Sequence, residues 1–263
     1  MIRINPTPYT NLNFKAYKHT ITNSQNEVVN RGDTCMFRND LDFNSLISYL
    51  ERKYSGISKV KVIAHACSDG EEAYSFVSNL IDKLGESGAN KFFPILARDI
   101  NDEHLSRAKS GKFFLESYEN SAIDYYLDNS FDKYFDIIDK NFIGKTVQVK
   151  NNIKDRIQFK KADILKDAPK TDFKNTVLFA RNFWPYLNTS DAEKLAKTLS
   201  EKMDITSTLV IGDYDCWGKI PTLLSKYGFR ETQIKNVYEC TNLSIAKSKC
   251  INLFKNFIKS FVK

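Results

Sequence analysis

Acidic and polar residues follow three apolar segments that have the composition of buried strands. The segment Cys67-Ser68-Asp69-Gly70-Glu71-Glu72 follows the apolar run 60–66, Asp99 lies near the end of 92–100, and Asp163 lies near the end of 156–164. Ligands of open parallel sheets bind at the carboxyl ends of the strands. A helix that begins after Gly70 would offer free backbone N–H groups there, and glycine lets the backbone approach a ligand closely. The three strand ends therefore predict one binding site.

The residue type at each strand end favours a nucleoside-containing ligand. Asp99 is placed to accept hydrogen bonds from both ribose hydroxyls, because Asn101 is the better cap for the following helix. Asp163, followed by apolar Ile164, suits an adenine edge and ring. The loop at Gly70 has one glycine where a dinucleotide fingerprint has three, which favours S-adenosylmethionine over NAD. For that loop alone, an ordinary strand-to-helix turn is the alternative reading.

The elements that must position these residues alternate between strand and helix. Buried strands are predicted at 60–66, 92–100, 156–164, 175–182 and 207–215, with a closing strand at 233–241. Amphipathic helices begin near Asp42, span 71–84 up to Gly85, follow Asn101, and follow a capping box at Ser190 and Glu193. This order predicts an α/β fold with a doubly wound, Rossmann-like parallel sheet.

Three other segments lie outside this alternation. Residues 1–40 contain a predicted β-hairpin within 14–38, and 41–243 form the main domain, with an inserted small subdomain at about 111–155. Residues 244–263 form a basic amphipathic helix, which can lie on an anionic membrane, occupy a partner's groove or fold back on its own domain.

Composition narrows the class of protein. The 263 residues carry 39 Lys and Arg against 32 Asp and Glu, a net charge of +7 that favours an acidic partner. We find no apolar run long enough to span a bilayer and no signal-peptide pattern, and expect a cytoplasmic protein. The five cysteines are scattered and the three histidines do not cluster with them, so no disulfide framework and no metal site is expected. We recognise no nucleic-acid-binding module.

Four short motifs occur in the order and spacing of one family. They are RGDTCMFR (31–38), ACSDGEEAYS (66–75), ARDI (97–100) with AKSG (108–111), and ARNFWPYL (180–187). Together they resemble the CheR-type S-adenosylmethionine-dependent methyltransferases, which methylate glutamates of bacterial chemoreceptors. The resemblance covers about residues 31–241, and the segment 66–75 is its most specific part. It implies a class I methyltransferase sheet, S-adenosylmethionine as the cofactor and a protein as the methyl acceptor.

The resemblance also implies roles for individual residues. Thr34 and Arg38 would lie near the methionine moiety and the reacting centre, Glu71 or Glu72 would meet the amino end of the cofactor, and Tyr186 would stand beside the methyl group. Arg38 and Tyr186 are thereby the expected catalytic residues. The remaining residues of the implied cofactor pocket are Ala66, Cys67, Gly70, Asp99, Ile100, Asp163, Ile164, Arg181 and Asn182.

The departures from the family pattern bear on the identity of the methyl acceptor more than on the binding of the cofactor. Gly32 replaces the family asparagine, Ala73 replaces proline, and Gly212-Asp213-Tyr214-Asp215 replaces Gly-His-Ser-Glu. The predicted hairpin occupies the place of the family's N-terminal helical domain. Glutamate methylation is the favoured function. The alternatives are a small-molecule or nucleic-acid methyltransferase of the same fold and a non-catalytic, cofactor-binding interaction module.

Overall fold

The structure is a computed structural model that describes residues 20–22, 28–31, 34–128, 130–216 and 219–241. The N-terminal part of the predicted hairpin and the predicted helix at 244–263 lie outside the described residues. The described part of the hairpin is an antiparallel pair, β1 (Thr20–Thr22) with β2 (Val28–Arg31).

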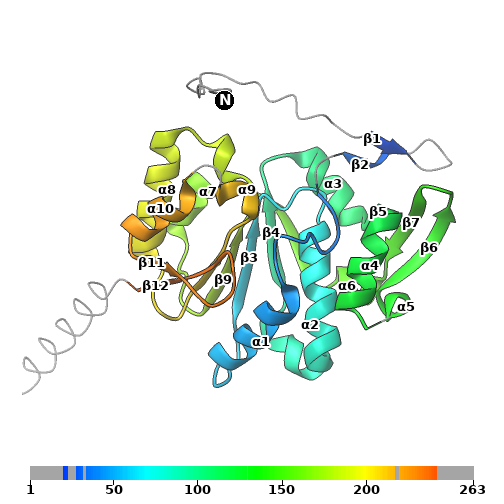
Figure 1. Ribbon diagram of the computed structural model, residues 1–263, viewed down its shortest axis with the longest axis horizontal. Coiled ribbons are helices and arrows are strands. Elements are labelled where there is room, and N and C mark those ends of the chain that lie inside the picture. The colour runs from blue at the N-terminus through cyan, green and yellow to red at the C-terminus, as the bar shows by residue number, and fades with distance from the viewer. Residues whose placement is uncertain (1–19, 23–27, 32–33, 129, 217–218, 242–263) are drawn as a thin grey trace, which may run out of the picture.

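The buried apolar runs form one seven-stranded sheet (Figure 1). In spatial order its strands are β11 (Phe229–Glu231), β12 (Val237–Cys240), β10 (Thr208–Val210), β9 (Thr176–Ala180), β3 (Lys61–His65), β4 (Ile95–Asp99) and β8 (Ile157–Lys161). Strands β8, β4, β3, β9 and β10 run parallel, and β12 is antiparallel to both neighbours. The chain proceeds outward from β3 to β8 and then returns to β9 on the other side. This reversal confirms the doubly wound sheet and places its switch point between β3 and β9.

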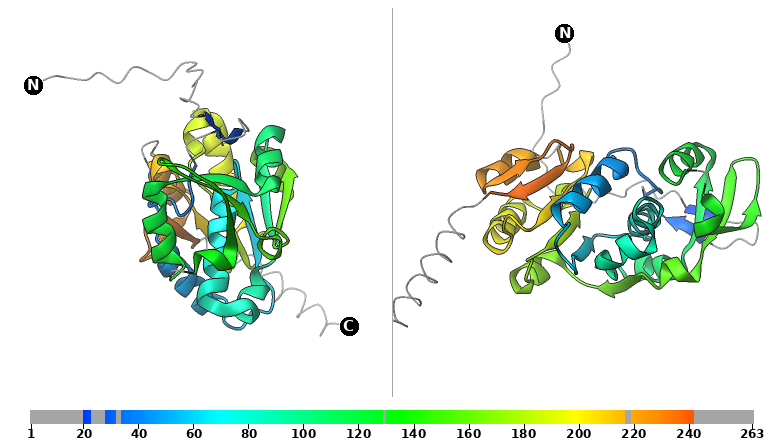
Figure 2. Two further views of the ribbon diagram at one scale, coloured as in Figure 1. Left: turned by 90° about the vertical axis from the view of Figure 1, so that its right-hand side faces the viewer. Right: turned by 90° about the horizontal axis from the view of Figure 1, so that it is seen from below.

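Helices cover both faces of this sheet (Figure 2). Val62 and Ala64 of β3 belong to one hydrophobic cluster, which includes α1 (Phe43–Lys53) and α2 (Glu71–Ala89). Ile63 belongs to the other, with α8 (Thr189–Lys202) and α10 (Ile220–Lys226). Successive side chains of a strand point to opposite faces, so a nearly continuous apolar strand supplies both clusters.

Helix boundaries follow the predicted local signal in one case and depart from it in two. Asn101 caps α3 (Asp102–Ser110) by accepting a hydrogen bond from Glu103 N, as predicted. Gly85 has φ 65° and interrupts α2, which then continues to Ala89 instead of ending. The predicted capping box at Ser190 is wrong, because Asn188 caps α8 through the N–H of Asp191.

A separate antiparallel sheet lies within 111–155, beyond α2 on the side away from α8 (Figure 1). Its order is β5 (Lys112–Glu116), β7 (Gly144–Val149) and β6 (Phe135–Lys140). The helix α4 (Ser117–Tyr126) follows β5 directly and packs with it. This places α4 where it can contact the N-terminal segment of the main domain.

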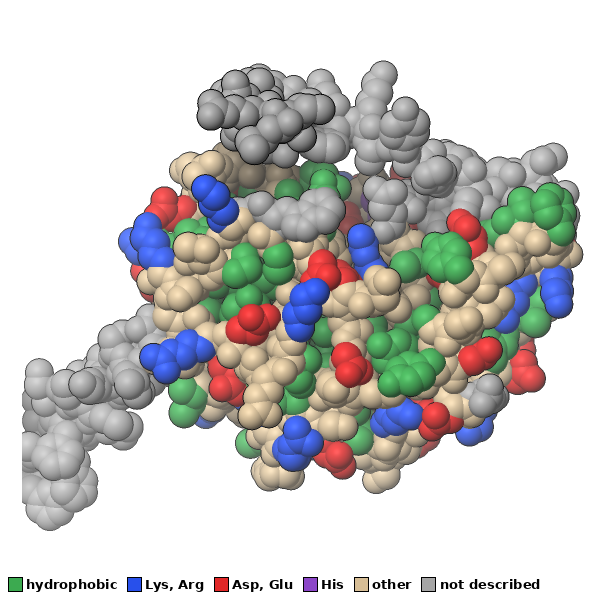
Figure 3. All heavy atoms as spheres, viewed as in Figure 1, with side chains coloured by type: hydrophobic (Ala, Val, Ile, Leu, Met, Phe, Trp, Pro, Cys, Tyr) green, Lys and Arg blue, Asp and Glu red, His purple; other side chains and the backbone are tan. Residues whose placement is uncertain are grey.

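The remaining elements are single turns that connect these layers. They are η1 (Asn90–Phe92), α5 (Phe131–Tyr134), α6 (Asn151–Lys154), α7 (Ile164–Asp167), η2 (Ala168–Lys170), η3 (Trp184–Tyr186) and α9 (Asp213–Cys216). No helix in the described part of the chain is long and apolar enough to cross a membrane. On the face shown in Figure 3, basic and acidic side chains are interspersed and do not gather in one basic patch.

Candidate functional site

The loop after β3 has an unusual backbone that brings it against the end of β4. Ala66, Ser68 and Gly70 have φ values of 55°, 49° and 97°. Ser68 N donates to Asp99 Oδ2 at 2.9 Å, and Asn101 N donates to Asp99 Oδ1 at 2.9 Å. Two of the predicted strand ends are therefore joined by a hydrogen bond. The third predicted strand end adjoins the second, because Ala162 N, one residue before Asp163, donates to Asp99 O at 2.9 Å.

Gly70 is required by space as well as by backbone conformation. A Cβ atom at this position would lie 3.1 Å from the Ala108 side chain and 3.2 Å from both Phe159 and Tyr74. The adjoining Cys67 is buried, and burial raises the pKa of its thiol well above the usual range. We assign Cys67 a packing role, because a thiol with a raised pKa is a poor nucleophile.

Glu71 and Glu72 begin α2 but have different surroundings. Glu72 forms an ion pair with Arg181, whose guanidinium also pairs with Asp40. Arg181 lies at the end of β9 with a side chain only 2% exposed, and the two carboxylates supply the counter-charge and the hydrogen-bond acceptors that a buried guanidinium requires. Sequence reasoning missed Asp40, since no local pattern connects it with a residue 141 positions away.

Glu71 is the carboxylate that the protein leaves available for a ligand. Both side-chain oxygens are buried, and neither has a hydrogen-bond partner of good geometry among the described residues. Burial raises the pKa of Glu71 well above its ordinary range, the charge of Asp69 adds to the rise, and the Thr34 hydroxyl opposes it. A buried carboxyl with unused acceptor oxygens suits a cationic group such as an ammonium.

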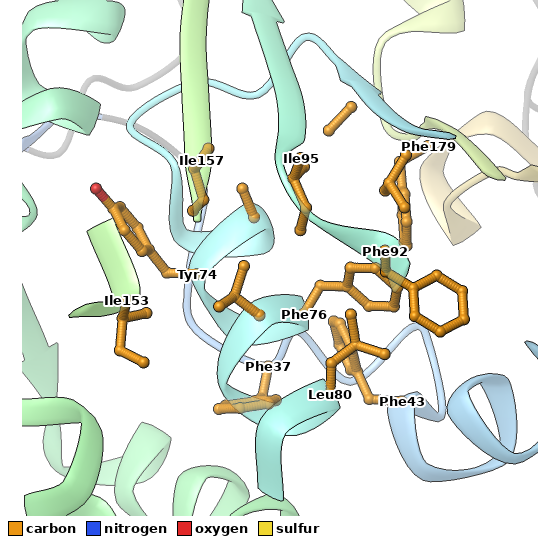
Figure 4. Close-up of a cluster of buried hydrophobic side chains, with 14 of the residues drawn as sticks. Phe37, Phe43, Tyr74, Phe76, Leu80, Phe92, Ile95, Ile153, Ile157 and Phe179 are labelled. Atoms are coloured by element: carbon orange, nitrogen blue, oxygen red, sulfur yellow. The ribbon is translucent and has the colours of Figure 1, made fainter. Parts of the chain in front are cut away.

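The segment 34–38 is held against α2 and α4. Met36 N donates to Glu119 Oε1 at 2.9 Å, and Phe37 N donates to Ser75 Oγ at 2.9 Å. Phe37 has φ 49°, and its ring stacks on Tyr126 with centroids 5.1 Å apart. Figure 4 shows Phe37 within the buried cluster that also contains Phe43 and Leu80. These contacts fix the backbone between Cys35 and Arg38.

Arg38 lies close enough to the acidic loop to influence it. Its side chain is half-buried. Its positive charge lowers the pKa of Glu72, although burial raises that pKa overall. The same charge opposes the rise of the Cys35 pKa to about 12, which burial and then Glu119 produce. The structure therefore brings Arg38, Glu72 and Cys35 into one electrostatic neighbourhood.

Asn182 joins the ends of β9 and β10. It has φ 59°, and its Oδ1 accepts a hydrogen bond from Tyr214 N at 3.3 Å. Asp215 accepts from Asn182 N at 2.7 Å and from Gly212 N at 2.8 Å. A Cβ at Gly212 would approach Asn182 Oδ1 to 2.0 Å, which explains the need for glycine there. Burial raises the pKa of Asp215 to about 6, although the hydrogen bonds from these N–H groups act to lower it.

The residues expected near the adenine, Ile100, Asp163 and Ile164, have different surroundings. Asp163 caps α7 by accepting from Leu165 N at 2.9 Å, and Ile164 packs in the hydrophobic cluster beneath α8. Ile100, by contrast, leaves 68% of its surface exposed immediately after the buried Asp99. An exposed apolar side chain at this place offers a surface for an aromatic base. The structure thus gives the Asp163 side chain a capping role, buries Ile164 and leaves Ile100 accessible.

Tyr186 lies on the opposite side of the switch point, in η3. It is 57% exposed, and its ring centroid is 6.3 Å from that of Tyr214. Tyr214 belongs to the segment that departs from the family pattern and was not singled out from sequence. The two rings form an accessible aromatic pair at the carboxyl end of the sheet.

These observations fit S-adenosylmethionine. Glu71 offers unused acceptor oxygens for an amino group, Asp99 is a buried carboxylate beside loop N–H groups, and Ile100 presents an apolar surface. The described residues contain no group of three or more His, Cys, Asp or Glu side chains placed to hold a metal ion. The residues at these strand ends thus suit the amino group, the ribose and the base of this cofactor.

Comparison with known proteins gives a family match over most of the chain. Residues 32–232 match the family model described as the SAM-binding domain of CheR methyltransferase. A chemotaxis protein methyltransferase of Borreliella burgdorferi is 26% identical over 191 residues, which cover 70% of this chain and 64% of that relative. The match thus spans less than two-thirds of the relative's length.

Among solved structures, the methyltransferase domain of bacterial CtHen1 aligns with a TM-score of 0.39 and 13% identity, covering 77% of this chain and 98% of that one. Magnesium protoporphyrin IX methyltransferase from Synechocystis PCC 6803 aligns with a TM-score of 0.37 and 12% identity, covering 79% and 84%.

Proposed function

Because this chain belongs to the CheR family of S-adenosylmethionine-dependent methyltransferases, we propose that it methylates the carboxylate side chains of glutamates in a protein. The Borreliella relative is a chemotaxis protein methyltransferase, which supports a protein acceptor. The observation that carries the proposal is the placement of Arg38, half-buried on a segment fixed from both sides and close to Glu72. A fixed guanidinium can bind a carboxylate through two parallel hydrogen bonds and so orient it.

The cofactor would supply a methyl group on a positively charged sulfur. We assign the hydrogen bonds to its ribose to Asp99, the contact with its amino end to Glu71, and an apolar contact with its base to Ile100. Of the two glutamates expected at the amino end, Glu71 is favoured because Glu72 is paired with Arg181. The buried charge network of Asp40, Glu72 and Arg181 would keep the end of β9 in place beside the loop between β3 and α2.

An ionised carboxylate is already a nucleophile at neutral pH, so the transfer needs no general base. The protein's contribution is therefore to align the two reactants and to exclude water. Arg38 would orient the acceptor, and Tyr186, exposed beside Tyr214, would line the entrance through which it arrives.

Radiolabelled S-adenosylmethionine tests this function. The full chain is incubated with the labelled cofactor and a lysate of the source organism, and the proteins are then treated with base. We expect protein-bound label that base releases as methanol, because glutamyl methyl esters hydrolyse readily. Arg38→Ala should reduce this label, whereas Arg52→Ala, a change at an exposed arginine of α1, should not.

Each alternative gives a different result. Label in nucleic acid or in small molecules would indicate a methyltransferase of the same fold with another acceptor. Cofactor binding without transfer to any lysate fraction would indicate an interaction module.

A further inference from the structure

A buried ionic cluster ties the loop between β3 and α2 to α3. Asp69 is 0% exposed, and its carboxylate is contacted by two side chains of that helix. His104 Nδ1 lies 2.5 Å from Asp69 Oδ1, and Arg107 donates from Nε to Oδ2 at 3.0 Å and from Nη2 to Oδ1 at 2.9 Å. The cluster spans 38 positions of sequence between Asp69 and Arg107.

The cluster keeps Asp69 ionised. Burial alone would raise the pKa of Asp69, but the hydrogen bonds and charges of His104 and Arg107 lower it below its ordinary value. A carboxylate can only accept hydrogen bonds, so we assign a proton to His104 Nδ1 for its contact with Asp69. Arg107 Nη2 lies 2.9 Å from the same nitrogen and, with this assignment, donates to Asp69 Oδ1 and not to the imidazole. A bidentate Arg–carboxylate pair also fixes geometry, because its two N–H bonds leave little freedom of rotation.

The cluster and Asp99 hold the same loop from two sides. Ser68 N donates to Asp99, and Ser68 Oγ lies 3.3 Å from His104 Nδ1. The positive φ values at Ala66 and Ser68 are disfavoured for residues with a side chain, so surrounding contacts must maintain them. Because α3 begins three residues after Asp99, fixing Asp69 on α3 also fixes the loop relative to the end of β4.

We propose that Asp69, His104 and Arg107 are positioning residues that hold the loop Cys67–Gly70 in its cofactor-binding conformation before the cofactor arrives. The proposal rests on the cofactor-binding role of this loop and is independent of the identity of the methyl acceptor. A loop that is ordered in advance loses less conformational freedom on binding, and affinity is correspondingly higher. Breaking the cluster should therefore weaken cofactor affinity although none of its members is assigned a contact with the cofactor.

The competing interpretation is an ion cluster that only stabilises α3. Stabilisation and positioning have different signatures, because the first changes the unfolding temperature and the second changes affinity in a protein that is still folded. His104 is suited to the distinction, since its side chain is 25% exposed and tolerates replacement better than the buried Asp69.

The experiment measures binding of S-adenosylhomocysteine to the full chain by titration calorimetry, with thermal unfolding of the free protein as the companion measurement. His104→Leu removes the N–H donor and should weaken binding about tenfold, as expected for loss of a hydrogen bond to a charged group. His104→Gln keeps a side-chain N–H and should remain within about threefold of the original affinity. Ser106→Ala, at an exposed position of the same helix, is the matched control and should change neither quantity.

Asp69→Asn extends the test to the carboxylate. It should weaken binding at least as much as His104→Leu, because it removes the charge that both partners share. Equal affinities for the original protein, His104→Leu and His104→Gln would overturn the proposal, as would an affinity loss in His104→Gln equal to that in His104→Leu. Should Asp69→Asn fail to fold, the His104 pair decides by the same criteria. This result does not depend on whether glutamate is the methyl acceptor, since S-adenosylhomocysteine binds without an acceptor.

Discussion

Glu119 gives the fold a pH dependence that can be measured. Its carboxyl is 5% exposed and accepts backbone hydrogen bonds from Met36 at 2.9 Å and from Glu116 at 2.8 Å. Burial raises its pKa from an ordinary 4.5 to about 7, the charge of Glu116 adds to the rise, and the two N–H donors oppose it. Between these two values the folded protein keeps a proton that the unfolded chain has lost.

The sign and size of the effect follow from proton linkage. A carboxyl whose pKa is raised by folding contributes stability that is fully present below 4.5 and is lost as the pH rises through about 7. At 1.36 kcal/mol for each pH unit between the two values, ionisation lowers the free energy of unfolding by about 3 kcal/mol. Replacing Glu119 with glutamine removes this contribution, because an amide does not ionise.

Urea denaturation at a series of pH values tests the prediction. The free energy of unfolding of Glu119→Gln, taken relative to the original protein, should increase by about 2.5 kcal/mol from pH 5 to pH 8, because part of the effect has already developed at pH 5. Taking the difference cancels the titration of the other groups. Asp124→Asn, at an exposed position of the same helix, is the control and should show no such trend. A difference for Glu119→Gln that is flat across this range would refute the assigned burial and its consequence.

Three further predictions concern the site. Gly212→Ala should lower the free energy of unfolding by about 1–3 kcal/mol in urea, because the new Cβ collides with Asn182 Oδ1; an unchanged midpoint would contradict the tight contact. Arg181→Met should cost about 3–5 kcal/mol in the same assay, since it leaves Asp40 and Glu72 without their cation, and a loss below about 1 kcal/mol would contradict the buried network. Binding of S-adenosylhomocysteine should release protons, because its ammonium favours ionised Glu71, so the calorimetric enthalpy should vary with the buffer's ionisation enthalpy in the original protein and not in Glu71→Gln.

Most of the central sheet was predictable because its signals are local. Apolar runs bounded by polar residues indicated the strands of the central sheet apart from the short β11, and the cap at Asn101 was read from residue type alone. The failure at Ser190 has a simple cause: Asn188 lies two residues earlier and is an equally good cap, so the helix begins there. Local patterns rank such competing caps poorly.

The contacts that build the site were less accessible to sequence reasoning. Asp40 meets Arg181 across 141 positions, and Glu119 meets Met36 across 83. In its own segment, Asp40 or Glu119 looks like an ordinary surface acid. Only the folded chain brings each of them to a buried partner. Asp163 shows the opposite case. The sequence suggested a side chain available to a ligand, whereas in the structure this side chain caps a short helix.

Methyl transfer to a protein carboxylate is the reaction proposed for this protein, and mass spectrometry of the methylated acceptor detects it at the modified residue. Peptides from lysate proteins incubated with the full chain and S-adenosylmethionine should contain glutamates that carry one additional methyl group as an ester sensitive to base. The modification should fall sharply with Arg38→Ala and persist with Arg52→Ala. Methyl groups found only on nitrogen atoms, on nucleotides or on small molecules would contradict the claim.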